Sequence, residues 1–195
     1  MPFTQTFDWP RPGRFVFPQG PDTVERSAGP AVGRAWWPLD LRGSIPPGGS
    51  SPDLSHTRPR GLKPAADEVV LLLENLSRTP GGPLVLGGFS QGAMVASEVA
   101  YRTDVPLAGL VLLSGTPVDE EVWKSGYGQR RGLPVFISHG RADPVLPFSG
   151  SDRMQHDLAA AGNRVTWVPF DGGHEMPAEV VIALNKFLRE LRQTF

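Results

Sequence analysis

From residue 62 to the C-terminus, short runs of apolar residues alternate with segments whose apolar residues recur at helical spacing. The short runs are typical of buried strands, because they are continuous and bounded by glycine, proline or polar residues. Such a strand–helix succession predicts an α/β fold with a mostly parallel sheet and helices on both of its faces. Right-handed crossovers would then bring the carboxyl ends of the strands to one edge, where open α/β sheets bind ligands.

The predicted elements cover most of the chain. Strands are expected at 15–17, 84–89, 107–113, 133–138 and 164–169. Helices are expected at 65–77, 91–101, 152–161 and 178–191. The charged segment 119–131 is interpreted as a solvated surface excursion, because charge runs usually face water.

Composition places the chain in the globular class. Its 195 residues suffice for one domain with a substantial core, so we expect a single domain over residues 1–195. The net charge is −1 with both signs interspersed, which argues against a nucleic-acid or membrane-surface partner. There are no cysteines, so disulfides, thiolate metal sites and a cysteine nucleophile are excluded.

The sequence shows no export or membrane segment. Its first residues lack the basic and apolar regions of a signal peptide. Uninterrupted apolar runs, such as 69–73, are far too short to cross a bilayer. A cytoplasmic location is therefore the expectation.

Ser90 stands in Gly88-Phe89-Ser90-Gln91-Gly92, directly after a predicted strand and before a predicted helix. This is the G-x-S-x-G pattern of a nucleophile elbow, in which a strained turn exposes the serine. We expect glycine at both 88 and 92 to avoid collisions across that turn. The backbone N–H of Gln91, at the helix N-terminus, is the expected oxyanion donor. The competing interpretation is a glycine-rich turn with an incidental serine.

A serine nucleophile of this type works with a histidine and with an aspartate that orients the histidine. Asp143 and Asp171 are the two candidates for that aspartate. Asp143 follows the strand predicted at 133–138, on a loop of its own downstream of Ser90. Asp171 lies only three residues before His174, and acids of this type usually come from a separate loop. Asp143 is therefore favoured over Asp171, and over a plain Asp-Pro turn.

His174 lies between the last predicted strand and the last predicted helix, which completes the order serine, aspartate, histidine along the chain. His139 is interpreted as a structural residue that is hydrogen-bonded near the site. His174-Glu175 also resembles the start of a zinc-protease motif, but the second histidine would fall at Ala178 and Pro177 would disrupt the helix. No metal site and no cofactor are predicted.

Three further residues are candidates for a substrate pocket because of their positions alone. Trp37 belongs to the pair Trp36-Trp37 in a proline- and glycine-rich loop, where an acyl pocket and core packing are equally plausible. Leu146 and Met176 flank the acid and the histidine.

Three blocks together resemble the phospholipase/carboxylesterase family, which includes bacterial carboxylesterases and acyl-protein thioesterases. The blocks are Leu86-Gly87-Gly88-Phe89-Ser90-Gln91-Gly92-Ala93, His139-Gly140-Arg141-Ala142-Asp143-Pro144 and Gly172-Gly173-His174-Glu175. Similarity extends through Arg34-Ala35-Trp36-Trp37-Pro38 and covers roughly residues 13–191. The resemblance implies a lidless α/β-hydrolase that acts on small carboxylic or thiol esters without a cofactor.

The sequence departs from the family at its start. Members usually open with a strand that ends in a Leu-His-Gly-type turn, whose backbone N–H supplies a second oxyanion donor. This chain lacks such a segment, so the expected fold is N-terminally shortened and the strand before Ser90 would expose an unpaired edge. We expect residues 3–9 or a second copy of the chain, in a homodimer, to cover that edge.

Two functional hypotheses follow. In the first, the chain is a serine esterase with Ser90, Asp143 and His174 as its triad, acting on small-molecule esters. In the second, it is a catalytically impaired, hydrolase-like binding protein. The intact triad favours the first hypothesis, and the missing N-terminal strand favours the second.

Overall fold

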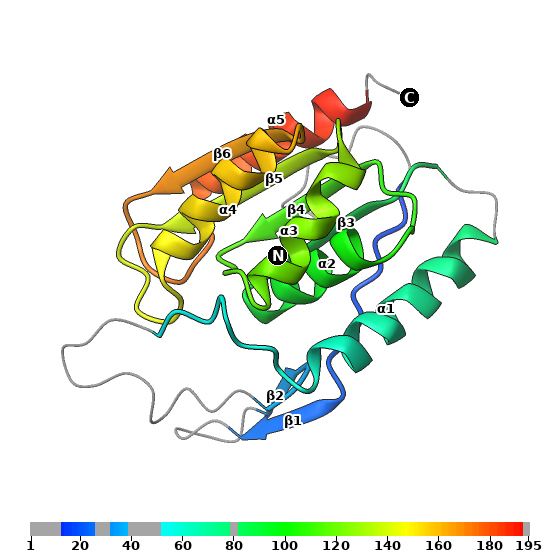
Figure 1. The fold of residues 1–195 in the computed structure, drawn as a ribbon, viewed down its shortest axis with the longest axis horizontal. Coiled ribbons are helices and arrows are strands. Elements are labelled where there is room, and N and C mark those ends of the chain that lie inside the picture. The colour runs from blue at the N-terminus through cyan, green and yellow to red at the C-terminus, as the bar shows by residue number, and fades with distance from the viewer. Residues whose placement is uncertain (1–12, 26–31, 39–51, 79–81, 193–195) are drawn as a thin grey trace.

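The computed structural model describes residues 13–25, 32–38, 52–78 and 82–192. Its centre is a four-stranded parallel sheet in the order β3-β4-β5-β6 (Figure 1). The strands are β3 (Val85–Phe89), β4 (Gly109–Leu113), β5 (Pro134–Gly140) and β6 (Arg164–Phe170). The four strands predicted after residue 62 are all present, and the α/β fold class is confirmed.

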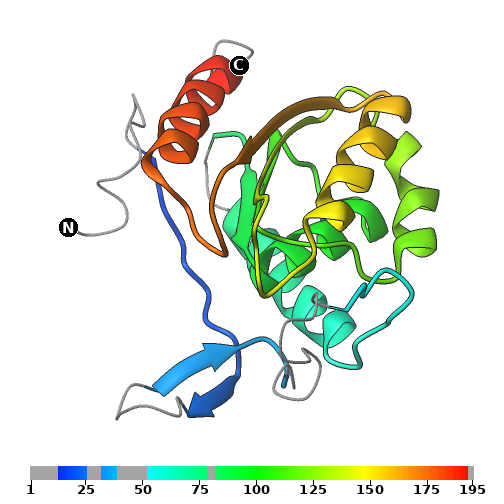
Figure 2. The same ribbon diagram turned by 90° about the vertical axis from the view of Figure 1, so that its left-hand side faces the viewer.

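Helices cover both faces of this sheet. They are α1 (Leu62–Ser77), α2 (Gln91–Arg102), α3 (Glu120–Tyr127), α4 (Phe148–Ala160) and α5 (Ala178–Arg192), with a short 3₁₀ helix at Gly128–Arg130. Figure 2 shows α5 on one side of the sheet and the other helices on the opposite side. The largest boundary error among the predicted helices is at α4, which begins at Phe148 rather than at residue 152.

Side chains along the buried strands point alternately to the two faces of the sheet, and this divides the core into two clusters. Leu110 and Leu112 of β4 face the larger cluster, which α1, α2, α3 and α4 complete. Val111 and Leu113 face the smaller cluster under α5. Successive side chains of a strand point to opposite faces, so a sheet covered on both sides needs strands that are apolar throughout.

The interpretation of segment 119–131 as a surface excursion is wrong. Most of it folds into α3, where Trp123 and Tyr127 are 0% and 1% exposed. The Trp123 indole N–H donates to Glu98 Oε2 at 2.6 Å, which satisfies both groups inside the core. The charges that suggested a surface segment include Glu121, on the outer face of an amphipathic helix.

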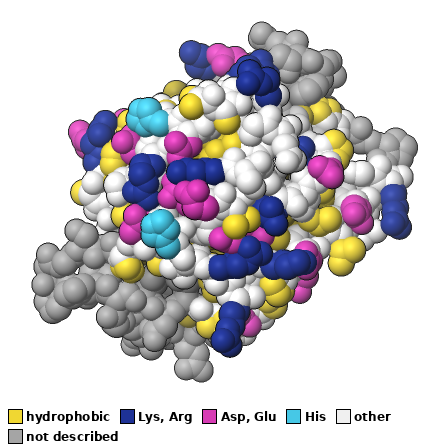
Figure 3. All heavy atoms as spheres, viewed as in Figure 1, with side chains coloured by type: hydrophobic (Ala, Val, Ile, Leu, Met, Phe, Trp, Pro, Cys, Tyr) yellow, Lys and Arg dark blue, Asp and Glu magenta, His cyan; other side chains and the backbone are white. Residues whose placement is uncertain are grey.

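On the described part of the face over α3 and α4, charges of both signs are interleaved (Figure 3). Lys124 lies 3.4 Å from Glu120 and 3.2 Å from Asp157, and Arg153 lies 3.0 Å from Asp53. This face therefore carries no extended patch of one sign among the described residues.

The strand predicted at 15–17 is wrong. Residues 13–20 have no regular secondary structure, and the first strand of the described residues is β1 (Asp22–Glu25), which pairs antiparallel with β2 (Val32–Ala35). Phe17 is 55% exposed, and Pro18 after it has no N–H to donate to a ladder.

β3 is bonded to β4 on one side, and no described residue pairs with its other side. Residues 3–9, which we expected to cover this edge, lie outside the described residues. The homodimer therefore stays a prediction.

Candidate active site

Ser90 occupies the turn between β3 and α2. Its N–H donates to the carbonyl of Leu113 at 2.8 Å, so the β3–β4 ladder continues up to the serine before the chain turns. The serine has φ 56° and ψ −119°, a region that residues with a Cβ seldom adopt. Strain of this kind persists only where the surrounding structure enforces it, and it gathers at functional sites.

The two glycines of the motif have different roles. A Cβ on Gly88 would lie 2.1 Å from the carbonyl carbon and oxygen of Gly92, so this position accepts glycine only. Among the described residues outside its own helix, a Cβ on Gly92 would meet nothing closer than Trp36 Nε1 at 3.9 Å, which is an ordinary contact. The predicted collision is confirmed for Gly88 and is wrong for Gly92.

The first turn of α2 presents free N–H groups beside Ser90. The carbonyl of Ser90 accepts hydrogen bonds from Ala93 at 2.9 Å and from Met94 at 3.3 Å. The N–H groups of Gln91 and Gly92 come before these and have no acceptor within the helix. Together with the positive end of the helix dipole, they form a suitable environment for an oxyanion.

The carboxylate of Asp143 is fixed at both oxygens. Oδ1 accepts hydrogen bonds from the N–H groups of Val145 at 2.7 Å and Leu146 at 3.0 Å, and Oδ2 lies 2.7 Å from Nδ1 of His174. The side chain is 0% exposed. Burial by itself would raise the pKa of Asp143, but hydrogen bonds from His139, His174 and the backbone bring it well below 3.8.

His174 lies in the loop between β6 and α5, with its side chain 16% exposed. Its ring packs on Phe89 with 4.9 Å between the centroids, and this contact brings it beside the turn that holds Ser90. Asp171 does not compete for it, because its carboxylate is 97% exposed and lies 3.5 Å from Arg141. The predicted pairing of His174 with Asp143 is therefore confirmed.

Of the pocket candidates, Trp37 and Leu146 are core residues, 4% and 2% exposed, in the larger cluster. They present almost no surface to a substrate. Met176 is partly buried against the smaller cluster and stays a candidate for substrate contact. Trp36 is half-buried, and its indole nitrogen approaches Gly92, so it is the member of the tryptophan pair that lies near the turn.

Two side chains beside the candidate site were not predicted from the sequence. Ser114 follows β4 with φ 45°, and its hydroxyl donates to the carbonyl of Glu175 at 3.3 Å, which ties it to the histidine loop. The rule that singles out residues just after strands would have found it. The second is the side chain of Gln91, which bonds to the backbone of Trp36 and Trp37. No local pattern predicts that contact.

Nowhere among the described residues do three histidine, aspartate or glutamate side chains gather as ligands of a metal ion would. None of the helices in this part of the chain is both long and apolar enough to cross a membrane.

The parallel sheet, its two helical layers and the residues at its carboxyl edge define an α/β hydrolase. The model of the Phospholipase/Carboxylesterase family matches residues 4–192, so the chain belongs to this family. The resemblance stated from the sequence is thereby confirmed.

Acyl-protein thioesterase 1 of Yarrowia lipolytica is 33% identical over 133 residues, which is 63% of this chain and 58% of the relative. Acyl-protein thioesterase 1 of Candida albicans is 33% identical over 64% of this chain and 56% of its own length. The chain thus matches little more than half the length of these two relatives.

Solved structures show the same fold. Esterase PE8 superposes with a TM-score of 0.65 at 29% identity, over 82% of this chain and 71% of its own. SOBER1 of Arabidopsis thaliana gives a TM-score of 0.70 over 91% of this chain and 83% of its own. At 19% identity, the second similarity concerns the fold alone.

Proposed function

We propose that the chain is a serine hydrolase that cleaves small carboxylic esters through an acyl-enzyme on Ser90. Small thioesters and small lysophospho-esters are further members of the proposed substrate class. One observation carries the proposal: a buried carboxylate holds His174 at 2.7 Å, and the ring of that histidine packs beside the strained Ser90 turn. Family membership and the similarity to acyl-protein thioesterases support it.

The proposed reaction begins when Ser90 Oγ attacks the carbonyl carbon of the ester while Nε2 of His174 removes the hydroxyl proton. Asp143 stabilises the resulting imidazolium, and the N–H of Gln91 donates to the oxyanion. Collapse of the tetrahedral intermediate transfers that proton to the departing alcohol or thiol. Water then attacks the acyl-enzyme with the help of the same histidine and releases the acid.

The proposed substrates are small and soluble, with short acyl chains. No lid segment is recognisable in the sequence, and the loops around the site are polar and rich in proline. Activity on a series of p-nitrophenyl esters is expected to fall as the acyl chain lengthens from about four carbons to about twelve, since pocket size limits the longer chains. A preference for long-chain emulsified lipids would contradict this.

Covalent labelling with a fluorophosphonate probe tests the mechanism directly. The wild type should react, Ser90→Ala should lose both labelling and ester hydrolysis, and Ser114→Ala should keep labelling although its hydroxyl also lies at the sheet edge. Retained activity in Ser90→Ala would overturn the assignment of the nucleophile. A folded wild type that neither reacts nor hydrolyses any ester would instead support the hydrolase-like binding protein.

A further inference from the structure

A second histidine touches the same carboxylate oxygen as His174. His139 lies near the carboxyl end of β5, and its side chain is 0% exposed. Its Nε2 is 3.1 Å from Asp143 Oδ2 and 3.2 Å from the carbonyl oxygen of Leu146. Its Nδ1 is 2.7 Å from Oγ of Ser151 on α4. Both ring nitrogens therefore have partners in an environment without solvent.

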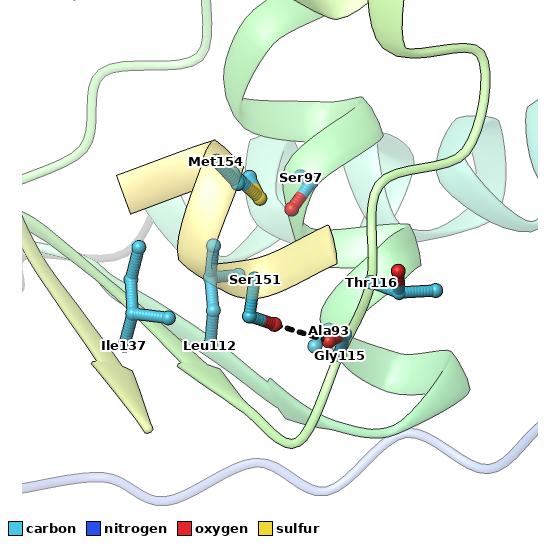
Figure 4. Close-up of a pocket in the computed structure, with 8 residues that line it drawn as sticks. All are labelled: Ala93, Ser97, Leu112, Gly115, Thr116, Ile137, Ser151 and Met154. Carbon is cyan, nitrogen blue, oxygen red and sulfur yellow. Dashed lines mark hydrogen bonds between the residues drawn. The ribbon is translucent and has the colours of Figure 1, made fainter. Parts of the chain in front are cut away.

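The direction of the Ser151 hydroxyl hydrogen shows whether Nδ1 of His139 carries a hydrogen. This oxygen lies 2.5 Å from the carbonyl oxygen of Gly115, as Figure 4 shows. A carbonyl only accepts, so the single hydroxyl hydrogen of Ser151 must point at Gly115. The oxygen of Ser151 is then an acceptor toward His139, and Nδ1 must supply an N–H.

The neighbours of Nε2 also accept hydrogen bonds. The carbonyl of Leu146 has no hydrogen to give, and both oxygens of Asp143 act as acceptors, Oδ1 from two backbone N–H groups and Oδ2 from Nδ1 of His174. An unprotonated Nε2 would face two oxygen lone-pair regions at close range with nothing between them. Nε2 must therefore carry a hydrogen as well.

We propose that His139 is a buried imidazolium that forms an ion pair with Asp143 and keeps this carboxylate ionised and oriented toward His174. The charge of His139 offsets that of Asp143, so the buried pair is neutral as a whole. The ring of Phe148 lies edge-on to His139, with 6.0 Å between centroids, and Arg141 lies over that ring at 5.3 Å. These groups close the site around the pair.

The acceptor capacity of Asp143 fits this assignment. A carboxylate has about four lone-pair positions, and here the N–H groups of Val145 and Leu146 take Oδ1 while His139 and His174 take Oδ2. Of the hydrogen bonds that lower the pKa of Asp143, the one with His139 lowers it most. His139 does not touch the reacting atoms, so it acts as a positioning residue through Asp143.

The protonation state can be measured in the resting protein without any substrate. In protein labelled with ¹⁵N-histidine, nuclear magnetic resonance should show two slowly exchanging ring N–H protons for His139 at neutral pH. The chain has four histidines, and the signals that vanish in His139→Gln identify the pair. Ser151→Ala removes the acceptor at Nδ1 and the donor to the carbonyl of Gly115 but leaves both partners of Nε2, so only one of the two slowly exchanging ring protons should be lost. A single ring N–H on wild-type His139 would overturn the proposal.

The catalytic part rests on the proposed function and needs a separate measurement. His139→Gln should lower kcat by at least about tenfold with little change in KM, because a charge-assisted contact to Asp143 is lost while the substrate contacts remain. His156→Gln, on the exposed side of α4, should change neither constant. An unchanged kcat in His139→Gln would refute the positioning role. If the wild type proves inactive, the esterase proposal fails, but the count of ring protons still decides the state of His139.

Discussion

The side-chain oxygen of Gln91 accepts a hydrogen bond from the backbone N–H of Trp36 at 2.7 Å, across 55 residues of sequence. The same amide donates to the carbonyl of Trp37 at 2.9 Å. One side chain thus holds two consecutive backbone groups of the tryptophan loop against the first residue of α2. Because the backbone N–H of Gln91 is the proposed oxyanion donor, a single residue joins that loop to the turn that holds Ser90.

Gln91→Ala should therefore lower the free energy of unfolding by about 1–3 kcal/mol, since it leaves two backbone groups of the tryptophan loop without their partners. Chemical denaturation measures this. Gln155→Ala is the matched control, because Gln155 is a partly exposed glutamine on α4 whose side chain contacts the neighbouring His156 rather than a distant loop, and it should change stability by less than about 0.5 kcal/mol. Equal stability of the two variants would show that the hydrogen bonds between Gln91 and the tryptophan loop contribute nothing to stability.

Alanine substitutions at the two motif glycines should differ sharply. Gly88→Ala places a methyl group 2.1 Å from the backbone of Gly92, so loss of more than about 3 kcal/mol or failure to fold is expected. Gly92→Ala meets only ordinary contacts and gains helix propensity, so its melting temperature should equal or exceed that of the wild type. Thermal unfolding followed by circular dichroism compares the two, and a destabilised Gly92→Ala would contradict the assigned contacts.

Backbone strain at Ser90 predicts an unusual order of stability. Ser90→Gly should be more stable than Ser90→Ala by about 1 kcal/mol, because glycine adopts φ 56° and ψ −119° without a Cβ clash. At Ser125, an exposed position inside α3, the order should be reversed, with glycine about 1 kcal/mol worse than alanine. Urea unfolding of the four variants provides the comparison, and the same order at both positions would argue against strain.

Asp143→Asn should reduce turnover by several orders of magnitude, roughly 10⁴-fold, because an amide holds His174 in the wrong tautomer. Asp171→Asn should leave turnover near the wild-type value, since that carboxylate is almost fully exposed. Steady-state kinetics on a short-chain ester distinguishes the two. A larger effect at Asp171 would transfer the role of the acid to it.

Low pH should reduce the free energy of unfolding by protonating Asp143. Burial raises the pKa of Asp143, but the hydrogen bonds from His139 and His174 outweigh it, so the folded-state pKa lies below the 3.8 of a free aspartate. The stabilisation is then fully present above pH 3.8 and is lost as the pH falls through the folded-state value. The difference in unfolding free energy between wild type and Asp143→Asn should therefore shrink as the pH falls from 5 to 2, because the folded-state pKa lies below that of a free aspartate. A difference that does not change with pH would show that ionisation of Asp143 is not coupled to folding.

Local sequence patterns were sufficient to predict the alternation of strands and helices, the elbow at Ser90 and the loops that carry Asp143 and His174. These features follow from local physics: hydrophobic periodicity, turn chemistry and the rule that parallel strands end at one edge. Two predictions were wrong for different reasons: burial of Trp123 and Tyr127 turned the charged segment into α3, and the strand expected at 15–17 has no regular structure because Phe17 is largely exposed and Pro18 has no N–H to donate.

The packing of elements that are distant in the sequence sets which side chains contact one another. It paired His174 with Asp143 rather than with Asp171, although Asp171 is far closer in sequence. It also buried Trp37 against Gly61, where a Cβ would lie 2.2 Å from the tryptophan Cβ, and left Trp36 near the catalytic turn. The physical reason is that burial and hydrogen bonding depend on groups brought together from distant elements, and their positions are set by how the helices pack on the sheet.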